Sequence, residues 1–295
     1  MPGFVDLHIH SCFSSDGDYA PAELIAMARE AGFAAISISD HDTTAAYPGA
    51  LEAAAGSGVE VVPGMEVTTL YADREFHLLL PYLDWTSPVI VRIAERITDG
   101  RWREARERVA KLAGLGLDIT WEEVERASPG VPPLGVAIAQ ILLEKPSSRE
   151  DPALGKYFES PAKAWAAYYF YRDYFMEGRP AAAEKHHMPL LDVLAQAPAS
   201  GAVPVLAHPG AYFENATRED LVALRDRGLA GLEVYTSYHS PEQTEFYRGL
   251  AGELDLVPTA GSDFHGRIKP HVRFGDIRDG GVEILERLLA RRRLS

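Results

Sequence analysis

Short apolar runs of strand length alternate with longer segments of helical periodicity over roughly the first sixty residues. Gly32 and Gly56 stand where the two helices should end, and Pro63-Gly64 closes the last of these strands. This order is typical of consecutive βαβ units. The expected strands span residues 4–9, 34–39 and 59–62, and the expected helices span residues 21–31 and 44–56.

The same alternation returns after residue 187. Repeated βα units favour parallel strands surrounded by helices, and a barrel brings the C-terminal ends of all its strands to one face. We therefore predict an α/β barrel rather than an open sheet. The expected strands here span residues 203–206, 231–235 and 256–260, and the helices span residues 188–200, 217–228, 241–252 and 282–292.

Between these two regions the alternation breaks. Residues 89–116 are predicted to form a long helix, and Thr120 is the expected N-cap of another. The aromatic run from Trp165 to Phe175 has helical spacing and is expected to pack a core. The predicted organisation is a barrel made of residues 1–84 and 186–295, with an inserted, mainly helical subdomain at residues 85–185.

Composition and charge narrow the class of protein. The 295 residues are 46% hydrophobic, which is enough for a full core, and the single cysteine excludes an intrachain disulfide framework. Lys and Arg number 29 against 43 Asp and Glu, and this net charge of −14 opposes binding to duplex nucleic acid. No basic and apolar leader follows Met1, and no stretch is long enough to cross a bilayer. We expect a cytoplasmic protein that acts on a small anionic substrate and does not bind membranes.

Histidine and aspartate side chains stand at or beside the ends of several of the strand-like runs. Neutral imidazole and carboxylate are preferred ligands of divalent transition metals. Side chains alternate along a strand, so His8 and His10 point the same way, and Asp6 on that face is placed to orient an imidazole. The pattern predicts a polynuclear metal centre. The histidines in these segments are His8, His10, His41, His77, His208 and His265.

The motifs together resemble the polymerase and histidinol phosphatase (PHP) family of metal-dependent phosphoesterases. They occur in family order, and they are most similar to the stand-alone branch of nucleoside 3′,5′-bisphosphate phosphatases, AMP phosphatases and short-RNA exoribonucleases. The resemblance implies a distorted (β/α)7 TIM-like barrel, with the inserted subdomain covering the active site. The segments that carry it are Asp6-x-His8-x-His10, Ser39-Asp40-His41-Asp42-Thr43, Gly64-Met65-Glu66, His77, Ala207-His208-Pro209 and Gly261-Ser262-Asp263-Phe264-His265-Gly266.

The resemblance also implies which residues hold two or three divalent ions, with Mn, Fe and Zn equally suited to the donors. Glu66 would bridge two ions, and Asp16 lies in a Ser-Asp-Gly segment that matches the family. The implied ligand sets are His8, His10, Glu66 and Asp263 for one ion, Glu66, His77 and His208 for a second, and Asp16, His41 and His265 for a third.

Catalysis is expected to involve Asp40, Glu66 and His208, with Asp40 supporting a ligand rather than binding an ion. A hydroxide that bridges two ions would attack phosphorus in line, while the ions and a cationic side chain neutralise the developing charge. We therefore predict a metal-dependent hydrolase of a small phosphorylated metabolite, either a nucleotide or a sugar phosphate, as a monoester or cyclic diester.

One departure from the branch concerns substrate recognition. Where relatives have a Gly-Arg-Pro-His segment at the start of a helix, the Arg and His positions are Gly135 and Ala137 in this chain. Two expected anion-binding groups are thus missing. The candidate replacements are Lys185, His186 and Arg267, and His239 is expected to be either a substrate contact or a loop histidine.

Several alternatives stay open at this point. Within the phosphoesterases, the chain could act on nucleoside 3′,5′-bisphosphates, on short RNA from its 5′ end, or on histidinol phosphate. Outside them, an amidohydrolase-like enzyme would need a carboxylated lysine at a strand end, and none is present. A non-catalytic metal-binding domain would tolerate the loss of ligands, whereas every ligand motif is present.

The missing Arg and His generate a specificity prediction. A charge-assisted contact to a second phosphate contributes about 1.5–3 kcal/mol, or roughly ten- to a hundred-fold in affinity. Without it, we expect a single phosphate or a cyclic phosphodiester to be preferred over a 3′,5′-bisphosphate. The measurement is kcat/KM for AMP, a cyclic ribose phosphate and adenosine 3′,5′-bisphosphate under one metal condition. A lead of about a hundred-fold or more for the bisphosphate would contradict the prediction.

Overall fold

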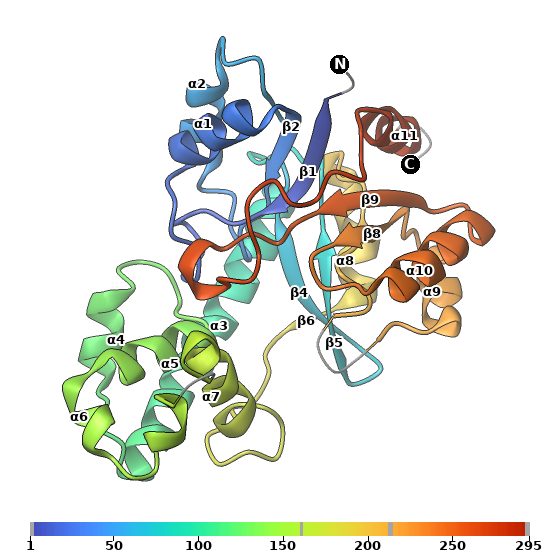
Figure 1. Cartoon of the computed structure of the whole chain (residues 1–295). Helices are drawn as coiled ribbons and strands as arrows, with labels where there is room; N and C mark the ends of the chain where they lie inside the picture. The colour runs from blue at the N-terminus through green and yellow to red at the C-terminus, as the bar shows by residue number, and fades with distance from the viewer. Residues whose placement is uncertain (1–2, 160–161, 212–214, 293–295) are drawn as a thin grey trace. The chain divides into compact units, whose positions relative to one another are not determined.

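The structure is a computed structural model that describes residues 3–159, 162–211 and 215–292. The chain forms two compact units (Figure 1). The first consists of Met1–Glu95, His187–Gly266 and His271–Ser295, and the second of Arg96–His186 and Arg267–Pro270.

The strands of the first unit form two sheets. One has the order β1-β2-β3 and is parallel, and the other has the order β6-β4-β5-β7-β8-β9. The strands are β1 (Phe4–Ile9), β2 (Phe33–Ile38), β3 (Glu60–Val61), β4 (Glu66–Tyr71), β5 (Arg74–Leu79), β6 (Met188–Pro189), β7 (Val205–Leu206), β8 (Gly231–Thr236) and β9 (Val257–Gly261).

This arrangement differs from a regular parallel barrel in two respects. The described strands do not close into one continuous sheet, because only the isolated bridges Ile9↔Phe264 and His41↔Glu66 link the two sheets. The prediction of parallel strands throughout is also wrong, since β5 runs antiparallel to both β4 and β7. A two-residue turn at Ala72 and Asp73, both with positive φ, folds β5 back on β4.

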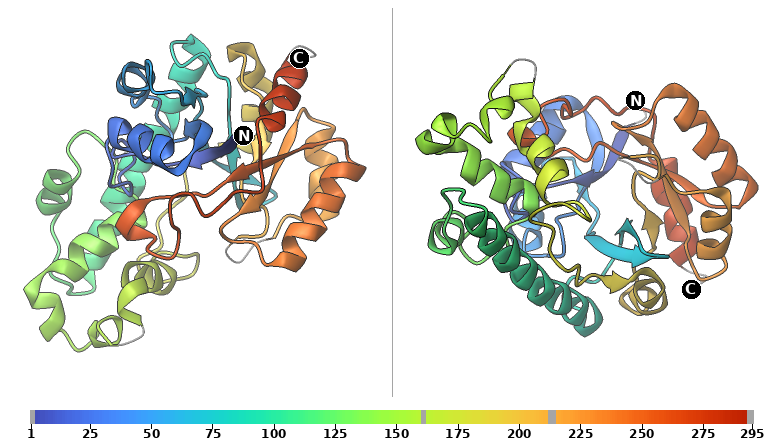
Figure 2. Two further views of the ribbon diagram at one scale, coloured as in Figure 1. Left: turned by 45° about the horizontal axis from the view of Figure 1, so that its top comes forward. Right: turned by 90° about the horizontal axis from the view of Figure 1, so that it is seen from below.

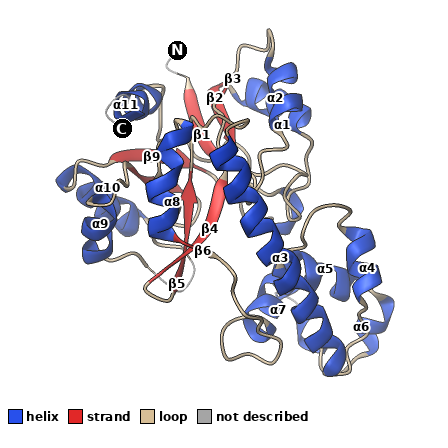
Figure 3. Cartoon of the chain, turned by 180° about the vertical axis from the view of Figure 1, so that it is seen from behind, coloured by secondary structure: helices blue, strands red, loops and turns tan. Residues whose placement is uncertain are grey.

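Helices cover the strands of the first unit. The α1 helix packs on β2 and on α2 (Figure 1), and α10 packs along β8 and β9 (Figure 2). Figure 3 shows α8 lying along β4 and β6 of the larger sheet. These helices are α1 (Pro21–Ala31), α2 (Tyr47–Ala54), α8 (Leu190–Gln196), α9 (Arg218–Arg225), α10 (Pro241–Glu253) and α11 (Glu283–Arg292).

The β1 strand is buried on both of its faces, and its two faces differ in chemistry. Val5 and Leu7 belong to an apolar cluster with Val205 and Leu285, as strand alternation requires. Asp6 and His8 point to the other face and are also fully buried. One strand therefore contributes both to the core and to a buried polar cluster.

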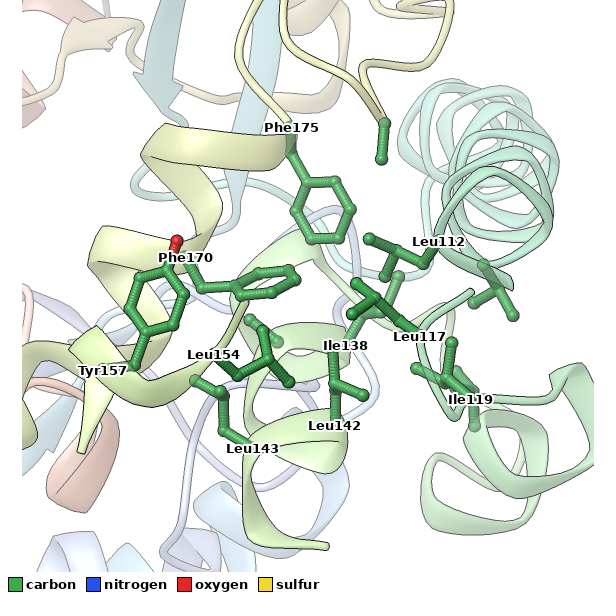
Figure 4. Packing of buried hydrophobic residues seen from close by; sticks show 14 of the residues in the cluster. Leu112, Leu117, Ile119, Ile138, Leu142, Leu143, Leu154, Tyr157, Phe170 and Phe175 are labelled. Atoms are coloured by element: carbon green, nitrogen blue, oxygen red, sulfur yellow. The ribbon is translucent and has the colours of Figure 1, made fainter. Parts of the chain in front are cut away.

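The second unit is helical and has its own core. Thr120 caps α4, because its hydroxyl accepts a hydrogen bond from the Glu123 backbone N–H at 3.3 Å, and this confirms the predicted N-cap. Phe170 and Phe175, from the aromatic run, pack with Tyr157 and with leucines in that core, as predicted for the run (Figure 4). The helices are α3 (Pro88–Gly114), which begins in the first unit, α4 (Trp121–Ala127), α5 (Gly135–Glu144), α6 (Pro146–Glu150) and α7 (Ala166–Tyr174).

Among the described residues, no helix combines the length and apolar character needed to cross a bilayer.

A buried tyrosine hydroxyl ties the end of β2 to the segment that precedes β4. Tyr47 is fully buried, its hydroxyl donates to the carbonyl oxygen of Ile38 at 2.7 Å, and it accepts a hydrogen bond from the Gly64 N–H. Tyr47→Phe would leave the Gly64 N–H and the Ile38 carbonyl without this partner, so we expect a loss of about 1–3 kcal/mol in the free energy of unfolding. Urea denaturation followed by circular dichroism measures it.

The control variant is Tyr71→Phe, at the partly exposed end of β4. It should change the free energy of unfolding by less than about 0.5 kcal/mol. Equal stability of Tyr47→Phe and the wild-type protein would show that the Tyr47 hydroxyl does not support this part of the fold.

Candidate metal centre

A cluster of nine histidine and acidic side chains lies among the strand ends of the first unit. Bridges between Ile9 and Phe264 and between His41 and Glu66 bring its segments together. His8 lies in β1 and His77 in β5, Glu66 begins β4, and the other members follow β1, β2, β7 and β9 (Figure 1). The residues are His8, His10, Asp16, His41, Glu66, His77, His208, Asp263 and His265.

Glu66 lies at the centre and is fully buried. Its Oε2 atom is 3.2 Å from Nε2 of His8, 3.2 Å from Nε2 of His10 and 3.0 Å from Nδ1 of His41. These three imidazoles come from strand β1 and from the segments after β1 and β2. One carboxylate oxygen thus faces one group of histidines.

The other oxygen of Glu66 faces a second group. Oε1 lies 2.7 Å from Nδ1 of His77 and 3.2 Å from Nε2 of His208. His77 is placed there by the antiparallel pairing of β4 with β5, which sets His77 opposite Thr68. A carboxylate whose two oxygens face different imidazole groups has the arrangement that two neighbouring ions would share.

Three sets of ligand atoms lie close enough to bind one ion each. His8, His10, Glu66 and Asp263 form one set, in which Asp263 Oδ1 is 3.2 Å from His8 Nε2 and 3.0 Å from His10 Nε2. This set has the composition that the family resemblance implies. The other two sets are His41, Glu66 and His77, and His10, Asp16, His41 and His265.

These two sets differ from the implied ones in membership. His41 joins Glu66 and His77, and His10 joins the group around Asp16. Asp16 Oδ2 is 3.7 Å from His41 Nε2 and 3.4 Å from His265 Nε2. Gly17 makes this loop possible, because a Cβ there would lie 2.1 Å from the Ser11 carbonyl oxygen.

The donor atoms fit divalent cations. In the described part of the chain, no hydrogen bond reaches Nε2 of His8, Nε2 of His10 or Oε2 of Glu66, although all three atoms are buried. Buried polar atoms are almost always paired, and atoms with lone pairs that face each other at 3.2 Å need a proton or a cation between them. Imidazole and carboxylate are the donors that Mn, Fe and Zn accept.

The charges in the cluster shift one another's protonation. Burial disfavours ionisation of Glu66, yet the imidazoles of His8 and His41 hold its pKa well below its usual range. Burial likewise opposes charge on His10 and His77, but the neighbouring carboxylates raise the pKa of His10 to about 9 and that of His77 to about 10. The carboxylates of the cluster thus favour positive charge on these two imidazoles, and an ion that binds them competes with protons.

Two of the candidate ligands have strained backbones. His208 has φ of 25° and Asp263 has φ of 56°, and neither is glycine. Such conformations cost about 1–3 kcal/mol each and persist where surrounding contacts impose them. The Asp263 N–H donates to the His8 carbonyl oxygen at 2.7 Å, which is one such contact.

Asp6 does not orient an imidazole, contrary to the sequence interpretation. Its Oδ1 atom accepts hydrogen bonds from the backbone N–H groups of His8 at 3.2 Å and Ser262 at 2.9 Å. Burial raises the pKa of Asp6 to about 6. The carboxyl group therefore joins β1 to the segment that follows β9.

Asp40, which was predicted to support a ligand rather than to bind an ion, contacts the residue that follows His10. Its Oδ1 accepts from the Ser11 N–H at 2.6 Å and its Oδ2 accepts from the Ser11 hydroxyl at 2.7 Å. Burial raises the pKa of this carboxyl group. Because both oxygens bind Ser11, Asp40 anchors the loop after His10.

His239 is held by backbone atoms at both ring nitrogens. Its Nδ1 lies 2.9 Å from the Val234 carbonyl oxygen, and its Nε2 accepts from the Gly210 N–H at 3.0 Å. The ring also stacks on Tyr247 at 5.0 Å between centroids. Of the two expected roles, the loop histidine agrees with these contacts, and His239 supports the turn after His208.

Three residues that the sequence did not single out contact the cluster. The Ser14 hydroxyl lies 3.2 Å from Nδ1 of His10 and accepts from the His41 N–H at 2.8 Å. The Tyr238 hydroxyl donates to Asp263 Oδ2 at 2.5 Å. Glu233 contacts His8 Nδ1 at 3.1 Å. Glu233 lies in the apolar run of β8, so its only signal was a charged residue inside a buried strand.

The remaining candidates for substrate contact lie in the second unit. Lys185, His186 and Arg267 all belong to it, and their role as phosphate contacts stays a prediction.

Known proteins resemble this chain in sequence. The PHP domain matches residues 6–113. A 3′,5′-nucleoside bisphosphate phosphatase of Chromobacterium violaceum is 25% identical, over 88% of this chain and 87% of the relative. A phosphoribosyl 1,2-cyclic phosphate 1,2-diphosphodiesterase of Eggerthella lenta is 28% identical, over 91% of this chain and 97% of the relative.

A solved structure resembles the whole chain. A protein of Bifidobacterium adolescentis, assigned as a metal-dependent phosphoesterase, superposes with a TM-score of 0.82 at 28% identity. The match covers 99% of this chain and 98% of that protein. The mixed α/β fold is therefore shared with this solved structure.

The central position of Glu66 generates a metal-binding prediction. Glu66→Gln keeps the side-chain volume but removes the charge that both imidazole groups face. We expect the variant to fold and to lose bound metal. Its activity should fall by more than about 100-fold, which is the upper end of the loss seen when a residue that only contacts a metal ligand is removed. Metal analysis of the purified protein and kcat are the measurements.

Glu60→Gln, an exposed change on β3, is the matched control and should keep both metal and turnover. Metal content and kcat of Glu66→Gln equal to those of wild type would exclude a bridging role for Glu66.

Proposed function

We propose, from the premise that this chain is a PHP-domain metal-dependent phosphoesterase, that it hydrolyses a single phosphate ester or a cyclic phosphodiester of a small metabolite. A nucleotide or a sugar phosphate is the substrate class. Two or three divalent ions, from among Mn, Fe and Zn, would serve as cofactors.

One observation carries this proposal. The two oxygens of the buried Glu66 carboxylate face separate groups of imidazoles, and Oε2 at their centre has no hydrogen bond within the described residues. Structural ion pairs do not need so many donors around one carboxylate. A pair of ions that share Glu66 explains the arrangement, and paired ions of this kind are typical of phosphoryl transfer.

The protein's own residues would hold the ions and exclude competing protons. When bound, divalent ions lower the pKa of water and neutralise charge on phosphoryl oxygens. His8, His10 and Asp263 would hold one ion, and Tyr238 would keep Asp263 oriented through its 2.5 Å hydrogen bond. His77 and His208 would hold the other ion against the opposite oxygen of Glu66.

A third ion would be held by Asp16, His41 and His265. Although burial alone would raise it, the neighbouring imidazoles of His265 and His41 hold the pKa of Asp16 well below its usual range. A carboxylate that stays ionised while buried is suited to bind a cation. His10 belongs both to this set of ligand atoms and to the set around Glu66 and Asp263. This shared residue supports ions that are neighbours rather than independent.

The distorted (β/α)7 barrel is also part of the proposal. The bridges Ile9↔Phe264 and His41↔Glu66 connect the two sheets at both of their junctions, which supports a ring of strands with weak seams. The proposal includes the division into a barrel at 1–84 and 186–295 and an inserted helical subdomain at 85–185, together with a cytoplasmic location.

Substrate choice rests on the second unit. A Cβ on Gly135 would lie 2.8 Å from Nη1 of Arg108, so this guanidinium lies beside the first residue of α5. This guanidinium is already paired with Glu104 at 2.5 Å, so only the helix N-terminus itself favours an anion here. The candidates for a cationic phosphate contact stay Lys185, His186 and Arg267.

Other phosphoesterase activities are ranked lower. Hydrolysis of 3′,5′-bisphosphates or of short RNA ends requires groups that Gly135 and Ala137 do not supply. Histidinol phosphate is disfavoured because the residues of the motifs are more similar to those of the stand-alone branch. Cleavage of a C–N bond is disfavoured because no lysine stands at the end of a predicted strand, and a purely structural metal site is disfavoured because every ligand motif is present.

The absence of a nucleophile with an activating base in the motifs generates a mechanistic prediction. We expect water to attack phosphorus directly. A single turnover of a phosphomonoester in 18O-water should place the label in inorganic phosphate, and protein denatured during turnover should carry no phosphate. Rapid quench with 32P-labelled substrate measures the second point.

Cys12→Ser is the control, because Cys12 is the one thiol, is exposed and lies in the loop between His10 and Asp16. Its rate should equal that of wild type within about twofold, since surface substitutions are usually tolerated. Phosphate trapped on any side chain would replace direct hydrolysis with a two-step mechanism.

A further inference from the structure

Glu233 is an acidic residue in an otherwise apolar strand. It lies in β8 between Leu232 and Val234, and all three side chains are fully buried. An ionised carboxylate in such a place costs several kcal/mol unless strong hydrogen bonds compensate it. The partners of its two oxygens therefore indicate why it is there.

The two oxygens bind parts of the chain that are far apart in sequence. Oε1 lies 3.1 Å from Nδ1 of His8, and Oε2 accepts the backbone N–H of His208 at 2.7 Å. His8 faces Oε2 of Glu66, and His208 faces Oε1. Glu233 thus contacts one histidine from each of the two groups around Glu66.

The first contact selects the tautomer of His8. A carboxylate can only accept, so Nδ1 must carry the proton in the hydrogen bond to Glu233. Nε2 is then the nitrogen with a free lone pair, and it points to Glu66 Oε2 and Asp263 Oδ1, each at 3.2 Å. This is the nitrogen that an ion shared with Glu66 and Asp263 requires.

The second contact supports the strained backbone of His208. With φ of 25°, this residue needs contacts that impose the conformation. The short hydrogen bond from its N–H to Glu233 is such a contact, and it fixes the point from which the His208 ring extends toward Glu66.

The neighbouring strand leaves space for this arrangement. A Cβ on Gly261, in β9, would lie 2.1 Å from Glu233 Oε1 and 2.4 Å from the Cβ of His8. Any other residue at this position would displace the pair. The glycine here is explained by the close approach of Glu233 to His8 rather than by its backbone angles.

We propose that Glu233 is a positioning residue that orients His8 and His208 at the same time. The two ion positions on either side of Glu66 therefore depend on this one side chain. The inference rests on the proposed function, because it takes His8 and His208 to be ion ligands. Glu233 itself binds no ion, and it acts only through the ring nitrogen of one histidine and the backbone of the other.

Glu233→Gln tests this directly. A glutamine has one acceptor oxygen and one donor NH2, so it can satisfy only one of the two partners. If its oxygen accepts from the His208 N–H, its NH2 faces His8 Nδ1 and favours the tautomer with the proton on Nε2. If its oxygen accepts from His8, its NH2 opposes the His208 N–H. Either orientation weakens ion binding.

The first measurement is the Zn²⁺ dissociation constant, obtained by competition with a chelator. Loss of an outer-shell partner raises such constants by about 10- to 100-fold, and we expect a rise of this size for Glu233→Gln. Asp220→Asn is the matched control. Asp220 is also buried and charged in the first unit, but it pairs with Arg74 and belongs to the capping box of α9 with the N-cap Thr217. Its Zn²⁺ affinity should equal that of wild type within about twofold.

The second measurement is the nitrogen NMR spectrum of the histidine rings in the Zn²⁺-loaded wild-type protein, which reports the tautomer of each ring. The proton of His8 should be on Nδ1, with Nε2 bound to the ion. A proton on Nε2 of His8 would overturn the proposal. Because this measurement uses the wild-type protein, it tests the proposal even if Glu233→Gln does not fold.

The outcomes separate the inference from the function it rests on. A folded Glu233→Gln variant, verified by circular dichroism, with wild-type Zn²⁺ affinity overturns the role of Glu233 alone. Wild-type protein that binds no divalent ion and releases no phosphate overturns the proposed function and this inference with it. Weaker binding in Glu233→Gln, normal binding in Asp220→Asn and the Nδ1–H tautomer of His8 support the proposal.

Discussion

The buried carboxylate of Glu66 is the constraint on which the rest of the first unit depends. An isolated buried anion costs several kcal/mol, so proton donors or cations must face both of its oxygens. The imidazoles that meet this requirement come from β1, from β5 and from the segments after β1, β2 and β7. Because the Glu66 side chain contacts all of these segments, displacement of any one of them would leave an oxygen of this carboxylate with fewer partners.

The antiparallel hairpin explains how two imidazole groups reach the two oxygens of one carboxylate. In a purely parallel barrel, neighbouring strands present their C-terminal ends on one face. The β4–β5 hairpin instead returns the chain after two turn residues, and pairing of Glu66 with Leu79 places His77 two residues along on the adjacent strand. The departure from a regular barrel is therefore what brings His77 to Glu66.

Buried carboxylates hold the loops of the centre through backbone N–H groups. Asp6 binds the N–H of Ser262, Asp40 binds that of Ser11, and Glu233 binds that of His208. Each of these bonds fixes a segment that directly follows a strand or a ligand. Charge-assisted bonds of this kind are about twice as strong as neutral ones, and they support strained residues such as His208.

The sequence by itself determined the ligand residue types, the shared face of His8 and His10, the helical core of the second unit and the caps at Gly32 and Thr120. These follow from local periodicity and residue chemistry. The direction of β5, the attachment of Asp40 to Ser11 and the pairing of Glu233 with His8 were decided only by the tertiary structure. His8 and Glu233 are separated by 225 residues, and no local pattern encodes which buried carboxylate meets which imidazole.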